Sequence, residues 1–183
     1  KADVMVVRHP HAGAPHFLAR HVDSSIVNAG DGGHAHPTQA LLDLFTIKRH
    51  LGTIEGLRVA IVGDILYSRV ARSNLWGLTK MGAQVVLCGP PTLMPTDFRN
   101  DCRSNEEHPF AGVEIETSVD RAIEGADVVM ALRLQFERQQ GGHLPTIREY
   151  SRMYGITAGR MERAREGALV MHPGPMNEGV EIA

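Results

Sequence analysis

The sequence predicts an α/β fold in which a doubly wound parallel sheet carries helices on both faces. Short apolar, β-branched runs alternate with segments of helical length, and this alternation is typical of strand–helix–strand units. Several of the runs are apolar at nearly every position, as expected of strands that are covered on both faces. The predicted strands lie, in chain order, in DVMVV, SIVN, LRVAIVG, AQVVLC, VEIET, DVVMAL and ALVMH.

Three helices are predicted between these strands. The first follows the segment HPTQ, with Pro37 at the first helical position and Gly52 as its end. Its predicted core-facing stripe is mainly apolar and consists of Ala40, Leu41, Leu44, Phe45, Lys48 and Leu51. The second runs from about Ser68 to Lys80 and is expected to face the sheet with Val70, Leu75, Trp76 and Leu78. The third carries Ile147, Tyr150 and Tyr154.

The composition is that of a soluble globular protein. With 183 residues, 43% of them hydrophobic, the chain can bury one good core or two small ones. No apolar run reaches the roughly 18 to 20 residues of a membrane-spanning helix. A net charge of -2 without a basic cluster argues against a nucleic-acid partner. Cys88 and Cys102 are too few for a disulfide framework and fit a reducing compartment, so we expect a cytoplasmic protein.

Charged and amide side chains follow the ends of most predicted strands. Because ligands of open α/β sheets bind beyond the carboxyl ends of the strands, we expect these side chains to meet at one edge. One arginine alone more often forms a weak surface ion pair, but several at one edge can each hold an anionic group with two parallel hydrogen bonds. The converging set is Arg8, His36, Gln39, Arg69, Arg133 and Gln135, with Asp31, Asp64 and Tyr67 also following strands. The set suits a small polyanionic ligand.

His36 has three possible roles. It could bind a metal with His34, but this pair lacks a third and fourth ligand at a suitable spacing. It could cap the helix that follows. Together with Gln39 it could instead donate to an oxygen that gains negative charge beside the helix N-terminus. The sequence favours the ligand site, with no metal and no cofactor, since the glycines do not form a dinucleotide-binding G-x-G-x-x-G pattern.

Five segments resemble the aspartate carbamoyltransferases, within the aspartate/ornithine carbamoyltransferase superfamily. They are VVRHP, NAGDGGHAHPTQALLDLFTI, VGDILYSRVARS, LRLQFER and HPGPMNEGVEI, and they occur in the family's order. Ornithine carbamoyltransferases typically have a cysteine in the HPTQ-like motif and another in the HPGP-like motif, and neither is present here. The resemblance runs along nearly the whole chain.

The resemblance implies transfer of the carbamoyl group of carbamoyl phosphate to L-aspartate, in pyrimidine synthesis and without a cofactor. It implies homotrimers with shared active sites, and dihydroorotase or a regulatory subunit as possible partners. By position, the residues expected around carbamoyl phosphate are Arg8, His36, Gln39, Gly174 and Pro175, the last two through backbone carbonyls. Those expected to hold the aspartate carboxylates are Arg69, Arg133 and Gln135. The isomer of the Gly174–Pro175 bond is left open.

The resemblance also implies a division into domains. The expected parts are the end of a carbamoyl-phosphate-binding domain at 1–35, an interdomain helix at 36–51, an aspartate-binding domain at 52–172 and the start of a return segment at 173–183. The family's Ser-Thr-Arg-Thr phosphate cradle, its serine- and lysine-containing loop and its closing helix are not in this chain. We therefore expect negligible carbamoyl transfer by this polypeptide alone. The segment 95–112 is expected to be a mobile surface insertion that leaves the site intact.

Two other functions are compatible with the sequence. One is a noncatalytic carbamoyltransferase-like subunit that serves as a scaffold for dihydroorotase, which the missing phosphate cradle keeps open. The other is carbamoylation of a different amino acid, in which Arg133 would not contribute to acceptor binding.

Overall fold

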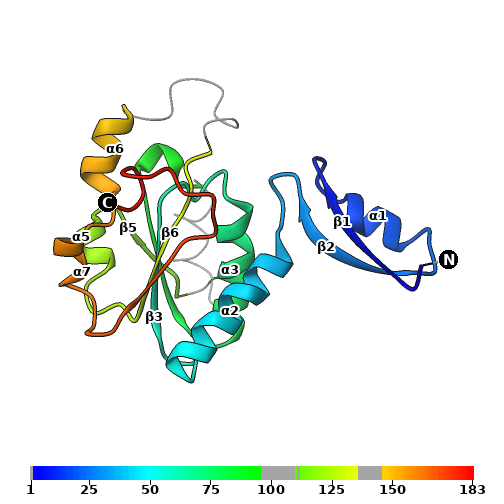
Figure 1. The fold of residues 1–183 in the computed structure, drawn as a ribbon, viewed down its shortest axis with the longest axis horizontal. Helices are drawn as coiled ribbons and strands as arrows, with labels where there is room; N and C mark the ends of the chain where they lie inside the picture. The colour runs from blue at the N-terminus through cyan, green and yellow to red at the C-terminus, as the bar shows by residue number, and fades with distance from the viewer. Residues whose placement is uncertain (1, 96–109, 111, 136–145) are drawn as a thin grey trace.

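The strands form two parallel sheets in the computed structural model, which describes residues 2–95, 110, 112–135 and 146–183 (Figure 1). The smaller sheet pairs β1 (Val4–His9) with β2 (Ser25–Asp31), and α1 (Ala14–Ala19) connects them. The larger sheet has the order β5-β4-β3-β6-β7. Its strands are β3 (Arg58–Val62), β4 (Gln84–Cys88), β5 (Glu114–Glu116), β6 (Val128–Ala131) and β7 (Leu169–Met171). Every neighbouring pair is parallel, which confirms the predicted α/β class.

Helices cover both faces of the larger sheet (Figure 1). On one face lie α2 (Pro37–Leu51) and α3 (Arg69–Lys80), and on the other α5 (Val119–Ala122), α6 (Ile147–Tyr154) and α7 (Ala158–Met161). Successive residues of β3 alternate between the two cores, because side chains of a strand point to opposite faces in turn. Val59 and Ile61 pack in the core under α2 and α3, whereas Ala60 and Val62 pack under α5 and α6.

The helices beside the sheet begin and end where local chemistry requires it. Pro37 occupies the first turn of α2, where its missing N–H has no intrahelical partner to lose. Gly52 ends α2 with φ 80°, a left-handed conformation that favours glycine. Ser68 precedes α3, and its hydroxyl accepts a hydrogen bond from the backbone N–H of Ala71 at 3.1 Å. The predicted ends of both helices are therefore confirmed within one residue.

The predicted buried face of α2 is partly wrong. Its buried residues are Ala40, Asp43 and Ile47, whereas Leu41 and Phe45 are 65% and 61% exposed. The helix has two overlapping apolar stripes, and the stripe through Ala40 and Ile47 is the one that contacts α3 and the sheet. Trp76 of α3 is likewise exposed, although Leu75 and Leu78 are buried as predicted.

The predicted loop between Gly89 and Gly112 is described only in part. It begins with a short 3-10 helix, η1 (Pro91–Leu93), whose Leu93 is fully buried. Most of the predicted insertion at 95–112, including Cys102, lies outside the described residues.

Candidate functional site

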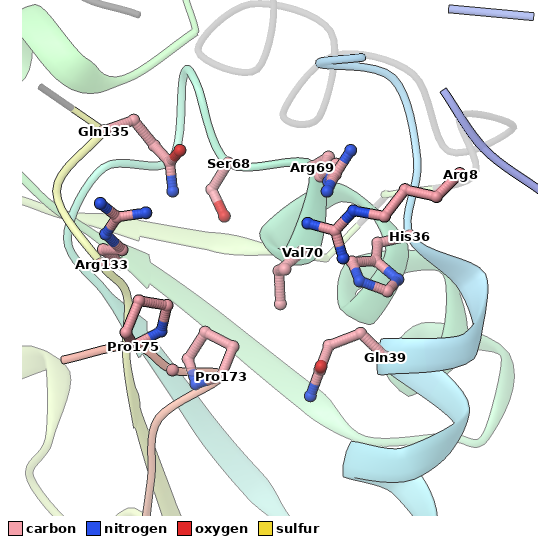
Figure 2. Close-up of a pocket in the computed structure, with 11 residues that line it drawn as sticks. Arg8, His36, Gln39, Ser68, Arg69, Val70, Arg133, Gln135, Pro173 and Pro175 are labelled. Atoms are coloured by element: carbon pink, nitrogen blue, oxygen red, sulfur yellow. The ribbon is translucent and has the colours of Figure 1, made fainter. Parts of the chain in front are cut away.

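A cavity of about 390 Å³ opens where the two sheets and α2 meet (Figure 2). Its lining residues are Arg8, His36, Gln39, Ser68, Arg69, Val70, Arg133, Gln135, Pro173, Gly174 and Pro175. Every residue that the sequence predicted for the site is in this set. Three of the lining side chains are guanidinium groups and none is a carboxylate, so among the described residues the wall of the cavity is strongly cationic.

The sheet topology explains why the arginines meet. From β3 the chain goes outward to β4 and β5, and then returns to the other side of β3 with β6. The point where the strand order reverses is where open α/β sheets bind ligands. Arg69, the first residue of α3, follows β3, and Arg133 lies just beyond the end of β6. Arg8 comes from β1 of the other sheet, and its guanidinium lies beside the His36 ring (Figure 2).

The backbone of His36 is fixed between the two helices. Its N–H donates to Ser73 Oγ at 2.8 Å, and its Nδ1 lies 3.3 Å from Thr38 Oγ1. His36 occupies the cap position of α2, but its side chain makes no capping hydrogen bond. The capping role that the sequence allowed is therefore wrong.

The His36 imidazole is in an environment that disfavours its charged form. Burial lowers its pKa first of all, and the positive charges of Arg69 and Arg8 lower it further. A neutral ring can donate one hydrogen bond without adding another positive charge to the cavity.

Arg69 is held against the loop that joins β2 to α2. Its guanidinium donates to the carbonyl oxygen of Gly32 at 3.1 Å. Gly30 has φ 120°, and a Cβ atom there would lie 2.9 Å from Arg69 Cζ. The guanidinium thus packs against a backbone that only glycine provides. Of the glycines in NAGDGG, Gly30 is the one that serves this close approach.

Gln39 differs from its predicted role as a donor to the ligand. Its Nε2 donates to Oδ1 of Asp43 at 2.9 Å, one helical turn further along α2. The amide nitrogen points away from Arg8 and His36 (Figure 2). The carbonyl oxygen of Gln39 therefore remains available to accept a hydrogen bond from a ligand.

The HPGP segment lies opposite Gln39 and next to Arg133 in the cavity wall (Figure 2). The Gly174–Pro175 peptide bond is cis. The buried carboxylate of Glu181 accepts from the backbone N–H of Leu134 at 3.0 Å and from that of Asn177 at 2.7 Å. Glu181 therefore joins the strand end that carries Arg133 to the segment that follows Pro175.

Comparisons with known proteins agree with this geometry. The pattern of the Asp/Orn binding domain of aspartate/ornithine carbamoyltransferase matches residues 55–183, and that of the carbamoyl-P binding domain matches residues 1–49. This chain belongs to the aspartate/ornithine carbamoyltransferase family. The family membership predicted from the sequence motifs is thus confirmed.

Relatives of this carbamoyltransferase chain are named aspartate carbamoyltransferase catalytic subunit. The protein of Heliobacterium modesticaldum is 56% identical over 181 residues, which cover 99% of this chain and 55% of the relative. The protein of a Roseiflexus species is 57% identical over 182 residues, covering 99% of this chain and 55% of the relative. The chain therefore spans about half the length of the curated relatives it matches.

Solved structures of the family share the fold. Aspartate transcarbamoylase from Trypanosoma cruzi with N-(phosphonacetyl)-L-aspartic acid matches with a TM-score of 0.76 and 34% identity, over 99% of this chain and 55% of that chain. The same enzyme with carbamoyl phosphate and aspartate matches with a TM-score of 0.79 and 33% identity, over 99% of this chain and 58% of that chain.

Some polar residues that follow strands lie outside this cavity. Asp31 is fully buried and accepts from the backbone N–H of Gly13 at 2.7 Å. Asp64 is also fully buried and accepts from the backbone N–H of Gln135 at 3.3 Å, which helps to place Gln135. Tyr67 lines a different hollow. These three side chains follow strands but do not line the cavity, because each holds a loop or faces elsewhere.

Sequence reasoning missed three lining residues, Ser68, Val70 and Pro173. Each is adjacent to a predicted site residue, and this adjacency was the available signal. The Nδ1 of His34 lies 3.0 Å from Asp31 Oδ2, and His34 does not line the cavity. Within the part of the chain that the structure describes, no three metal-ligating side chains gather. Nor does any described helix have the length and apolar character needed to cross a membrane.

Proposed function

We propose that this chain carries the aspartate carbamoyltransferase site, which transfers the carbamoyl group of carbamoyl phosphate to the amino group of L-aspartate. The products are N-carbamoyl-L-aspartate and phosphate, the second step of de novo pyrimidine synthesis. The observation that carries the proposal is the meeting of three guanidinium groups, one imidazole and two amides in one cavity. Support also comes from the Trypanosoma cruzi enzyme, whose structure contains both substrates.

The charges of the substrates match the cavity. Carbamoyl phosphate brings a phosphate, and aspartate brings two carboxylates, so anionic groups are available for each arginine. We assign Arg8, His36 and Gln39 to carbamoyl phosphate, together with the backbone carbonyls of Gly174 and Pro175. We assign Arg69, Arg133 and Gln135 to aspartate. With both substrates held, much of the rate comes from orienting the amine beside the carbamoyl carbon.

The reaction follows from these positions. The aspartate amine attacks the carbamoyl carbon, the new C–N bond forms and the carbonyl oxygen gains negative charge. Arg8 and a neutral His36 donate to this oxygen and stabilise it. The bond from carbon to the phosphate oxygen then breaks, and the proton lost by the amine leaves with the phosphate. Loss of one such donor typically raises the barrier by about 2.7 to 4 kcal/mol.

Aspartate suits the cavity better than ornithine as the acceptor. Ornithine has two amines, so when one of them attacks, the other remains an ammonium group, which needs a carboxylate or other acceptors nearby. The described residues lining the cavity include Arg69 and Arg133 but no Asp or Glu. A cationic acceptor would therefore be repelled, whereas a second carboxylate would be attracted.

The test uses a composite chain, in which this chain is joined to the parts of the Heliobacterium modesticaldum relative that it does not match. We expect the composite chain to form N-carbamoyl-L-aspartate, measured by a colourimetric assay. Arg133→Leu should raise the KM for aspartate by about 10- to 100-fold, the value of a lost hydrogen-bonded charge contact. Arg148→Leu removes an exposed arginine of α6 and is the matched control, with an expected KM equal to that of the unaltered protein.

Two results would contradict the proposal. One is an unchanged KM for aspartate after Arg133→Leu, which would favour a different acceptor amino acid. The other is a composite chain that neither turns over nor binds N-(phosphonacetyl)-L-aspartic acid, which would favour the noncatalytic scaffold. The 183-residue chain alone is expected to have negligible activity in the same assay.

We extend the proposal to the assembly, a homotrimer with shared active sites in the cytoplasm, with dihydroorotase or a regulatory subunit as possible partners. The family resemblance supports it, as do large apolar side chains that this chain leaves exposed. These include Val6 of β1, Phe17 of α1 and Phe45 of α2. Light scattering of the composite chain should give the mass of three chains, and a monomer at micromolar concentration would contradict the trimer.

A further inference from the structure

A buried carboxylate lies behind the cavity, between α2 and α3. Asp43 is only 5% exposed. Its Oδ1 accepts from Gln39 Nε2 at 2.9 Å, and its Oδ2 accepts from Asn74 Nδ2 at 2.7 Å. Asn74 is fully buried on α3. The three side chains therefore form a continuous line of hydrogen bonds from the cavity wall into the contact between the two helices.

Packing alone does not account for this line. Burial raises the pKa of Asp43, although the hydrogen bonds from Asn74 and Gln39 act in the opposite direction. The described residues give the carboxylate two amide donors and no ion pair. Apolar side chains of similar size in place of Asp43 and Asn74 would fill the same space without the cost of burying a charge. A function that needs the polar groups explains their presence better.

The line fixes which end of the Gln39 amide faces the cavity. An ionised carboxylate can only accept hydrogen bonds, so the nitrogen end of Gln39 must face Asp43. In Figure 2 this nitrogen points away from Arg8 and His36. A guanidinium can only donate, so the three arginines that line the cavity supply no acceptor. A carbamoyl group carries an NH₂ that requires acceptors, and the carbonyl oxygen of Gln39 is one.

We propose that Asp43 and Asn74 are positioning residues that hold the Gln39 amide with its carbonyl oxygen available to the carbamoyl NH₂. The inference deepens the proposed function and rests on it for the identity of the ligand. Asp43 sets the direction of the amide, and Asn74 holds Asp43 from the neighbouring helix. Without them the Gln39 amide can rotate so that its NH₂ faces the carbamoyl NH₂. Two hydrogen-bond donors would then meet.

A double-mutant cycle in the composite chain tests whether Asp43 acts through Gln39. Asp43→Ala and Gln39→Ala should each raise the KM for carbamoyl phosphate by a factor on the order of 10, the effect of one misdirected hydrogen bond. In the Gln39→Ala background, Asp43→Ala should have no further effect on this KM. An equal rise with and without Gln39 would overturn the inference, because Asp43 would then act by another route.

Two further variants separate positioning from general packing. Asn74→Leu removes the second donor but fills the helix contact, and it should raise the same KM in the same direction, which keeps the test decisive if Asp43→Ala does not fold. Ile47→Val removes one methyl group from a fully buried residue of α2 and is the packing control. It should lower the melting temperature and leave the KM unchanged. A KM raised equally by Ile47→Val would overturn the inference.

A readout without catalysis keeps this inference separable from the proposed function. The side-chain NH₂ of Gln39 gives its own NMR signals in the unliganded composite chain, and a hydrogen bond to Asp43 slows their exchange with water. Exchange should become faster in Asp43→Ala and in Asn74→Leu. Unchanged exchange would overturn the inference even if the enzyme is active. Absent activity with faster exchange would overturn the proposed function alone.

Discussion

The backbone N–H of His36 donates to the hydroxyl of Ser73 at 2.8 Å. This bond ties the start of α2 to the first turns of α3, two helices that belong to different stretches of the sequence. Residues at helix starts have N–H groups without intrahelical partners, and a side chain from elsewhere can satisfy them. Because α3 begins with Arg69, this bond couples the position of the His36 imidazole to that of the Arg69 guanidinium. Both groups line the same cavity.

We predict that Ser73→Ala destabilises the chain by about 1 kcal/mol, the usual net value of one hydrogen bond. The His36 N–H then has no protein partner, and the imidazole loses its fixed distance from Arg69. Affinity for carbamoyl phosphate should fall as well. Urea unfolding and ligand titration measure the two effects. Thr46→Ala, which removes a hydroxyl that bonds to Leu42 within α2, is the control and should leave ligand affinity unchanged.

The sequence predicted the strands and most of the residues that line the cavity, because both depend on local pattern. Apolar runs identify buried strands, and the topology of a parallel sheet brings the residues after those strands to one edge. The structure accordingly gathers Arg8, Arg69 and Arg133 from three separate segments.

The sequence did not predict which way a helix or an amide faces. The stripes of α2 through Ala40 and through Leu41 look equally apolar, and only contact with α3 and the sheet selects the first. The direction of the Gln39 amide depends on Asp43, which in turn is held by Asn74 from another helix. Such partners are set by packing between elements, which leaves no periodic signal in the chain.

Gly30→Ala should disturb the site more than the fold. The added Cβ would lie 2.9 Å from Arg69 Cζ, and φ 120° at this position is unfavourable for any residue with a side chain. The guanidinium must move away, so binding of N-(phosphonacetyl)-L-aspartic acid to the composite chain should weaken by about 10-fold or more. Calorimetric titration gives the affinity.

Gly33→Ala is the matched control for this change, in the same loop. No heavy atom lies within 4 Å of the position that its Cβ would occupy. Affinity for the same analogue should stay within about twofold of the unaltered protein, as for a surface substitution without special contacts. Equal losses in the two variants would contradict the requirement for glycine beside Arg69.

Asp31 should make the chain sensitive to acid. Burial by itself would raise the pKa of this carboxyl, but hydrogen bonds from Asn28, the Gly13 backbone and His34 outweigh burial and lower the pKa from 3.8 to about 2. As the pH falls, the Asp31 carboxylate takes up its proton at a higher pH in the unfolded chain than in the folded chain. Its contribution to stability is therefore complete above about pH 4 and is lost as the pH falls toward 2.

Thermal melting between about pH 5 and pH 2 measures this dependence. Asp31→Asn should lower stability at pH 5 by roughly 1 to 3 kcal/mol, because buried donors lose an ionised acceptor, and should flatten the decline below pH 4. Asp23→Asn replaces an exposed carboxylate nearby in the sequence and should preserve the shape of the decline. An Asp31→Asn chain with an undiminished decline would rule out this carboxylate as its source.

His36 should take up its proton at a lower pH than an ordinary histidine, whose pKa is 6.5. Burial is the main cause of its lowered pKa, and the charges of Arg69 and Arg8 add to it. The unfolded chain binds the proton first, so this group makes folding less favourable as the pH falls below 6.5.

NMR titration of the imidazole Cε1–H signal should give a midpoint below 6.5. Arg8→Gln removes one of the two charges and should raise that midpoint, whereas Arg148→Gln on α6 should not. A midpoint at or above 6.5 in the unaltered chain would mean that His36 is substantially protonated near neutral pH, contrary to the neutral donor that the cavity requires.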